Sequence, residues 1–113
     1  MTTEPVSSNE PRVDSERVLR IIQECLNEMN KCSPPITSDT AVHAYFLQNM
    51  GHADLEYLDL EFRLYAKLGV RLTRGDWNFL SGSTFCKTIE EWEIKYAPLF
   101  TFGRLAELIA RTR

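Results

Sequence analysis

The stretch between Gly51 and Gly69 limits most strongly what this chain can fold into. From Asp54 onward its apolar residues recur at helical spacing, and they form two neighbouring stripes. One stripe consists of Leu55, Leu58, Phe62 and Tyr65, and the other consists of Leu60, Leu64 and Leu68. Gly69 is placed to end this helix in a left-handed conformation. Together the two stripes are wider than the apolar face of a surface helix needs to be. We therefore expect either a central helix or a helix that contacts a partner through part of this apolar face.

Two further segments predict helices on either side of this one. Apolar residues recur at helical spacing from Val18 to Met29, with Cys25 among them, and predict a helix over about 15–30 that Asp14 or Ser15 caps. Thr101 is placed to cap a last helix. Its apolar stripe consists of Phe102, Leu105, Leu108 and Ile109, and Arg111 and Arg113 lie at its C-terminal end. The helix dipole favours cations there.

Proline and glycine divide the rest of the chain. Pro34 and Pro35 stop the first helix, and residues 36–48 predict a long loop with one helical turn near 42–47. Glycine and serine punctuate the segment 74–99. Within it, Thr88 and Glu91 form the pattern of a capping box, which predicts a short helix up to the proline at position 98.

Length and composition predict one all-helical domain. The 113 residues are enough for one core, and no repeat is present. Residues 1–13 are rich in proline, serine and asparagine, and we interpret them as a flexible N-terminal tail ahead of a helical domain at 14–113. The helical segments add up to a bundle of three main helices and one or two short ones.

Charge and cysteine content exclude several functional classes. The net charge of −3 argues against a basic nucleic-acid surface, and no apolar run is long enough to span a membrane. The polar N-terminus lacks the apolar part of a secretory signal, so we expect a cytoplasmic protein. The chain has three cysteines, Cys25, Cys32 and Cys86, and neither His43 nor His52 completes a zinc site with them. We therefore expect no metal.

Several short stretches together resemble acyl carrier proteins. Residues 49–60 resemble the signature Asp-Leu-Gly-x-Asp-Ser-Leu-Asp and the helix that follows it, and residues 67–72 resemble the Glu-Phe-Gly-Ile-x-Ile ending of that helix. Residues 36–40 and 101–105 resemble the entry to the first loop and the start of the final helix. The resemblance spans about 18–110, and a bacterial family of uncharacterised acyl-carrier-like proteins, which vary at the serine, is more similar still. It implies an acyl-carrier-like four-helix bundle with an enlarged segment before the last helix.

Asp54 is the main departure from the carrier pattern. In that family the serine that opens the second helix carries phosphopantetheine through a phosphodiester, and Asp54 occupies the matched position. A carboxylate has no hydroxyl to form this bond, so we expect no cofactor here. A helix N-terminus stabilises an anion, and a plain N-cap is the simplest interpretation of Asp54.

The resemblance also implies a protein-binding surface on this helix. Glu56 and Asp59 match positions at which carrier proteins present acidic residues to basic partner enzymes. The implied surface consists of Asp54, Leu55, Glu56, Asp59 and Phe62, and its partner would be a protein, basic in character. The alternative is a solvated acidic face, in which Asp59 and Arg63 stand at ion-pair spacing.

No set of nucleophile, base and orienting group is visible in the sequence, so we expect no enzyme. The function that fits best is a non-catalytic acyl-carrier-like protein with an interaction or accessory role in a bacterial lipid or polyketide-type pathway. The alternatives are a true phosphopantetheine carrier, aligned differently, and a binder of small apolar ligands.

The segment before the last helix is rich in aromatic residues. They are Trp77, Phe79, Phe85, Trp92, Tyr96 and Phe100. They form either a second layer of core or an exposed contact site, and we expect core. If this segment folds over the second helix, Phe62 and Tyr65 would touch one of the two tryptophans.

Overall fold

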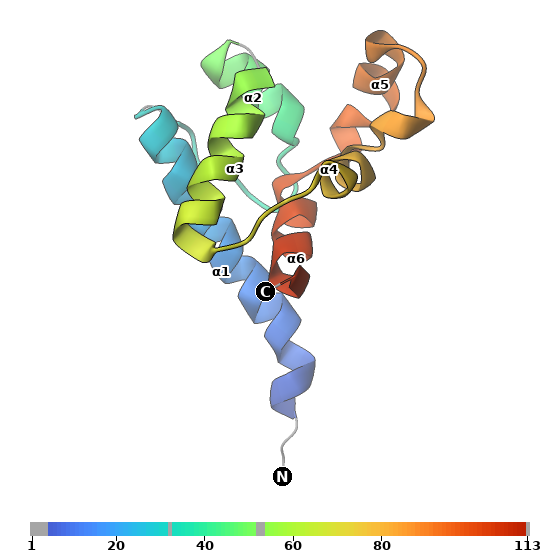
Figure 1. Ribbon diagram of the computed structural model, residues 1–113. Coiled ribbons are helices and arrows are strands. Elements are labelled where there is room, and N and C mark those ends of the chain that lie inside the picture. The colour runs from blue at the N-terminus through green and yellow to red at the C-terminus, as the bar shows by residue number, and fades with distance from the viewer. Residues whose placement is uncertain (1–4, 32, 52–53, 113) are drawn as a thin grey trace.

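The computed structural model describes the backbone of residues 5–31, 33–51 and 54–112, and the side chains of 14–31, 33–51 and 55–111. Its helices are α1 (Pro5–Met29), α2 (Val42–Met50), α3 (Asp54–Leu68), α4 (Arg74–Ser81), α5 (Ile89–Lys95) and α6 (Phe102–Thr112) (Figure 1). Two short 3-10 turns, η1 (Ser83–Phe85) and η2 (Ala97–Leu99), flank α5. Within these ranges the only β feature is an isolated bridge between Ala41 and Thr101. The predicted all-helical fold is therefore confirmed.

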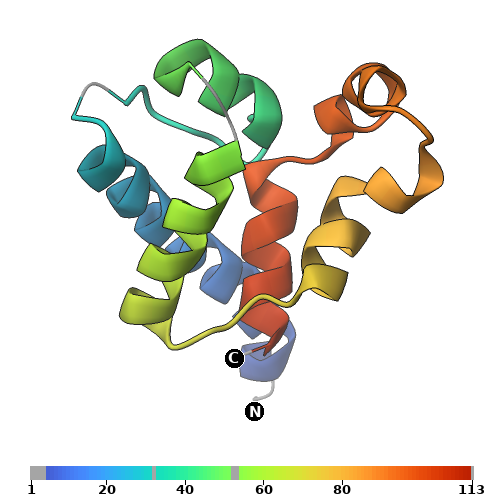
Figure 2. The same cartoon turned by 45° about the horizontal axis from the view of Figure 1, so that its top comes forward.

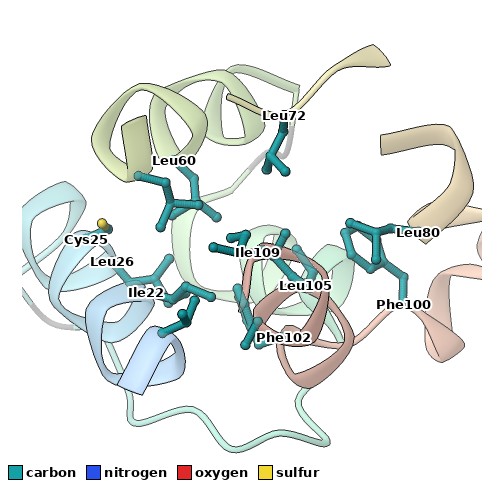
Figure 3. Close-up of a cluster of buried hydrophobic side chains, with 14 of the residues drawn as sticks. Ile22, Cys25, Leu26, Leu60, Leu72, Leu80, Phe100, Phe102, Leu105 and Ile109 are labelled. Atoms are coloured by element: carbon teal, nitrogen blue, oxygen red, sulfur yellow. The ribbon is translucent and has the colours of Figure 1, made fainter. Parts of the chain in front are cut away.

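The core lies between the three longer helices, because α3 and α6 both pack against α1. Its fully buried side chains include Val18, Ile22, Cys25 and Leu26 of α1, Leu60 and Leu64 of α3, and Phe102, Leu105, Ala106 and Ile109 of α6. Figure 3 shows the labelled side chains of these helices pointing toward one another, with Leu80 and Phe100 at one side of the cluster. Apolar burial of this kind is the main stabilising term of a small domain.

The start of α2 is joined to the start of α6. The backbone N–H of Val42 donates to the carbonyl of Phe100, and that of Phe102 donates to the carbonyl of Thr40, each at 3.0 Å. Close by, the N–H of Gly103 donates to the carbonyl of Ser38 at 3.0 Å. A Cβ on residue 103 would lie 2.5 Å from that oxygen, so the approach requires glycine.

Residues 74–99 form a separate segment, which we call the arm. It contains α4, η1, α5 and η2, and it lies to one side of the three longer helices in both views (Figure 2). Leu80 and Ala97 are its buried apolar residues. The arm is the segment before the last helix that the resemblance describes as enlarged.

The N-terminal boundary of the first helix was predicted wrongly. The helix begins at Pro5 instead of near Ser15, so residues 5–13 belong to it and not to a tail. Proline is suited to a first helical position, since its fixed φ is helical and its missing N–H has no partner to lose there. Pro11 lies inside this helix, although it has no N–H to donate to the preceding turn and usually disfavours a helix interior. Residues 1–4 lie outside the described part of the chain.

The prediction of one or two short helices was also too low, since α2, α4 and α5 are all present. The predicted single turn at 42–47 extends to Met50 because Val42, Tyr45 and Phe46 bury their side chains. The capping box of α4 was not predicted. The hydroxyl of Thr73 accepts from the N–H of Asp76 at 3.1 Å, and the carboxylate of Asp76 accepts from the N–H of Thr73 at 2.9 Å.

The capping box predicted for α5 forms only in part. Thr88 accepts from the N–H of Glu91 at 3.1 Å, as expected. The carboxylate of Glu91 accepts from the N–H of Lys87 instead of that of Thr88, also at 3.1 Å. The helix still begins at Ile89, because one satisfied donor and a β-region cap residue suffice.

Candidate functional site

The two apolar stripes of α3 have different surroundings. Leu60 and Leu64 are buried in the core. Leu55 is 66% exposed, Leu58 55%, Phe62 74% and Tyr65 49%. We call these four residues the outer stripe. The sequence left open whether the wide apolar face marks a central helix or a partner surface, and the structure divides it between the core and the solvent.

The predicted partner-binding residues are only partly available on this surface. Asp54 is the first residue of α3, and its side chain lies outside the described residues, as does His52 entirely. Leu55 and Phe62 are exposed, whereas Glu56 and Asp59 are half-buried. The surface that α3 offers is therefore more apolar than the prediction of an acidic face implied.

Asp59 takes part in an ion-pair network that joins α3 to α1. Its carboxylate accepts from Nε of Arg63 at 2.8 Å, which confirms the predicted i, i+4 pair. Nη1 of Arg63 also lies 3.1 Å from Glu28 of α1, and Nζ of Lys67 lies 2.8 Å from the same carboxylate. The hydrogen bond from Lys67, followed by the one from Arg63, holds the pKa of Glu28 below its ordinary value. Asp59 is thus already paired with Arg63, which in turn is paired with α1.

A cavity of about 290 Å³ lies between α3 and the arm, and we call it the aromatic cavity. It is lined by four rings, Tyr57, Trp77, Trp92 and Phe100, together with Leu58, Glu61 and Ser81. Nε1 of Trp77 donates to Oε1 of Glu61 at 3.1 Å, and Nε1 of Trp92 donates to the carbonyl of Ser81 at 2.8 Å. Both indoles are thereby fixed at the wall of the cavity.

The second core layer expected from the aromatic residues between Trp77 and Phe100 forms only in part. Phe100 is buried and the two tryptophans are half-buried, but Phe79 is 70% and Phe85 75% exposed. Trp77 packs against Tyr57, with ring centroids 5.6 Å apart, and leaves Phe62 and Tyr65 uncovered. The arm therefore borders the outer stripe without covering it.

His43 lies in α2, within the predicted helical turn. Its Nε2 is 3.2 Å from Oε2 of Glu93, and its Nδ1 is 3.4 Å from the hydroxyl of Tyr57. The edge of the ring meets Trp92, with centroids 4.6 Å apart. These contacts join α2, α3 and α5 beside Trp92, which lines the aromatic cavity. They could not be predicted because the partners are distant along the chain.

Cys25 packs in the core, on the apolar face of α1, as predicted. Burial raises the pKa of its thiol to about 11, so the thiol stays protonated near neutral pH. Cys32 lies outside the described residues.

Among the residues described, no group of three or more potential metal-binding side chains comes together. In the same ranges, no helix has the length and apolar character needed to cross a bilayer.

Comparisons with models of protein families, with curated proteins and with solved structures found no match to this chain.

Proposed function

We propose that this chain is a non-catalytic, acyl-carrier-like helical protein that binds a partner protein through the outer stripe of α3. The observation that carries the proposal is the exposure of Leu55, Leu58 and Phe62, each more than half exposed on one helix face. Contiguous apolar surface of this kind is a mark of interaction sites. An accessory role in a lipid or polyketide-type pathway follows from the sequence resemblance alone.

The spacing of the outer stripe indicates what the partner presents. Its residues follow one another at intervals of three, four and three, which is the a–d pattern of two heptads. The matching surface is a second amphipathic helix laid along α3 with its own apolar stripe inward. The two acidic residues beside the outer stripe are already engaged, because Glu61 accepts from Trp77 and Asp59 accepts from Arg63. We therefore expect apolar packing to contribute more to the affinity for the partner than charge does.

Binding is tested with two phenylalanines of nearly equal exposure. A photo-crosslinking residue placed at Phe62, with Glu107 of α6 as the control position, identifies the partner in cells. The purified partner is then titrated with the unaltered chain, with Phe62→Glu and with Phe79→Glu. We expect Phe62→Glu to weaken binding at least about tenfold, or about 1.4 kcal/mol, because it places a charge in a desolvated contact.

Phe79→Glu should bind as the unaltered chain does, since Phe79 belongs to α4 and not to the outer stripe of α3. Equal losses from the two variants, or crosslinks that are as frequent from position 107 as from position 62, would rule out the outer stripe as the binding site.

A separate experiment tests whether the chain can carry phosphopantetheine. Incubation with coenzyme A and a broad-specificity phosphopantetheinyl transferase should leave the intact mass unchanged. An Asp54→Ser variant is the control for the site, since gain of mass there would place residue 54 in the carrier position. Added mass on the unaltered chain would show that it is a true carrier and refute the non-carrier proposal.

A further inference from the structure

The aromatic cavity offers a ligand π surface and one negative charge. Of the seven residues that line it, Glu61 is the only one with a charged side chain, and four are aromatic. Phe100 closes the inner side, with its centroid 6.2 Å from Trp77 and 6.3 Å from Tyr57. A cation near such rings is attracted by their quadrupoles, and a neighbouring carboxylate adds to the attraction.

The polar groups of the rings are already engaged. The indole N–H of Trp77 donates to Glu61, and that of Trp92 donates to the carbonyl of Ser81. The hydroxyl of Tyr57 is in contact with His43. An anionic ligand, such as a fatty acid, would find no ring donor to pair with and would face the carboxylate of Glu61. A cation without N–H donors would leave no donor unpaired on entering, and Glu61 would offset part of its lost hydration.

The volume of the aromatic cavity also bears on the class of ligand. A volume of about 290 Å³ lies at the lower end of the range for small-molecule sites. A compact head group fits within this volume. Among cations, a quaternary ammonium group is large, weakly hydrated and without N–H donors, so it matches apolar walls better than a primary ammonium does.

We propose that the aromatic cavity binds a quaternary ammonium group, held over the rings of Tyr57, Trp77 and Trp92 and paired with the carboxylate of Glu61. The hydrogen bonds that fix the two indoles before any ligand arrives reduce the entropy cost of binding. This site does not depend on the partner surface proposed above, with which it shares Leu58.

The two tryptophans of the chain both line the cavity, so intrinsic fluorescence reports on it directly. The probe is choline, titrated at constant ionic strength, and the control is 3,3-dimethyl-1-butanol, in which carbon replaces the charged nitrogen. Choline should give a saturable change with a Kd of about 1 mM or lower, and the neutral isostere should bind at least about tenfold more weakly.

Matched variants assign the charge to Glu61. Glu61→Gln keeps an oxygen for the Trp77 N–H and removes the charge, so it should raise the Kd for choline about tenfold. Glu107→Gln on α6 removes a charge outside the cavity lining and should leave choline binding unchanged. The choline titrations test Glu61 and the partner titrations test Phe62, so failure of this site is distinguishable from failure of the proposed partner surface.

Three results would overturn the proposal. They are a response to choline that does not saturate, equal affinity for choline and its neutral isostere, and displacement of choline by decanoate at a lower concentration than by tetramethylammonium. The comparison of choline with the isostere on the unaltered chain stands even if Glu61→Gln does not fold.

Discussion

The three longer helices and the arm use their apolar residues in opposite ways. Apart from the outer stripe of α3, the former bury theirs: Ile22, Leu60 and Leu105 are inaccessible to solvent. The arm exposes most of its own, namely Phe79, Phe85, Ile89, Ile94 and Leu99, each more than half exposed. The first region is stabilised by apolar burial, and the second is attached by a few ring contacts and hydrogen bonds.

This difference shows that apolar content alone does not decide what holds a segment in place. Exposed ion pairs and hydrogen bonds such as His43–Glu93 contribute about 0–1 kcal/mol each, whereas a fully buried leucine contributes about 1.5–3 kcal/mol. The arm should therefore open at a lower free energy than the core, which is the usual behaviour of segments that serve binding.

The largest expected effect comes from removing a core side chain. Leu105→Ala should lower the free energy of unfolding by about 2–5 kcal/mol, because it leaves a cavity among buried neighbours. Ile94→Ala in the arm should change it by less than about 0.5 kcal/mol, since Ile94 is 77% exposed. Urea unfolding followed by circular dichroism measures both. A loss at Ile94 as large as that at Leu105 would contradict the division into two regions.

A pair of glycine variants should give the next largest effect. Gly103→Ala places a methyl group against the Ser38 carbonyl and should destabilise the protein by about 1–3 kcal/mol. Gly75→Ala in α4 meets nothing closer than 3.6 Å, so helix propensity should make it neutral or stabilising by up to about 1 kcal/mol. Thermal unfolding of the two variants checks the sign, and a destabilised Gly75→Ala would count against the geometry of α4.

Thiol labelling compares the regions without perturbing either. In a Cys32→Ser background, iodoacetamide at pH 8 should modify Cys86 of the arm at least about tenfold faster than Cys25. Burial raises the pKa of Cys25 to about 11, and its modification also requires the core to open. Peptide mass analysis over time gives both rates. Equal rates would show that the arm and the core open together.

The smallest effect concerns the ion pairs between α1 and α3. The folded-state pKa of Glu28 is lowered by Lys67 and Arg63, so its contribution is present above the ordinary value of 4.5 and is lost as pH falls through the lower folded value. Glu28→Gln should therefore lower Tm slightly at pH 7, and the difference from the unaltered chain should shrink below pH 4.5. Glu107→Gln is the control, and a difference that grows in acid would contradict the network.

Helix α3 was predictable because its signals are local. The apolar spacing continues from Leu55 to Leu68, and Gly69 adopts a φ of 70°, which glycine tolerates and other residues rarely do. The ion pair between Asp59 and Arg63 followed from the same spacing. Its third member, Glu28, lies on α1 and could not be inferred without knowing how the two helices pack.

The elements that the sequence analysis missed depend on tertiary contacts or on weak local signals. Helix α2 is stabilised by burial of Val42 and Phe46. No short-range sequence pattern predicts that these two side chains are buried. Helix α4 has a capping box at Thr73 and Asp76, but the glycine between them suggested a loop. At the candidate site, the outer stripe was visible as a pattern, whereas the aromatic cavity requires Tyr57 and Trp92 to meet from distant parts of the chain.

The arm is anchored at both ends by buried residues, since Leu72 precedes it and Phe100 follows it. The carbonyl of Phe100 also accepts from Val42 at 3.0 Å, which fixes the return point to α2. A segment tethered at two points can tilt away from its neighbours but cannot diffuse from them. Its detachment and return are therefore unimolecular, with a high effective local concentration, and a ligand that wedges the aromatic cavity open would not release the arm from the molecule.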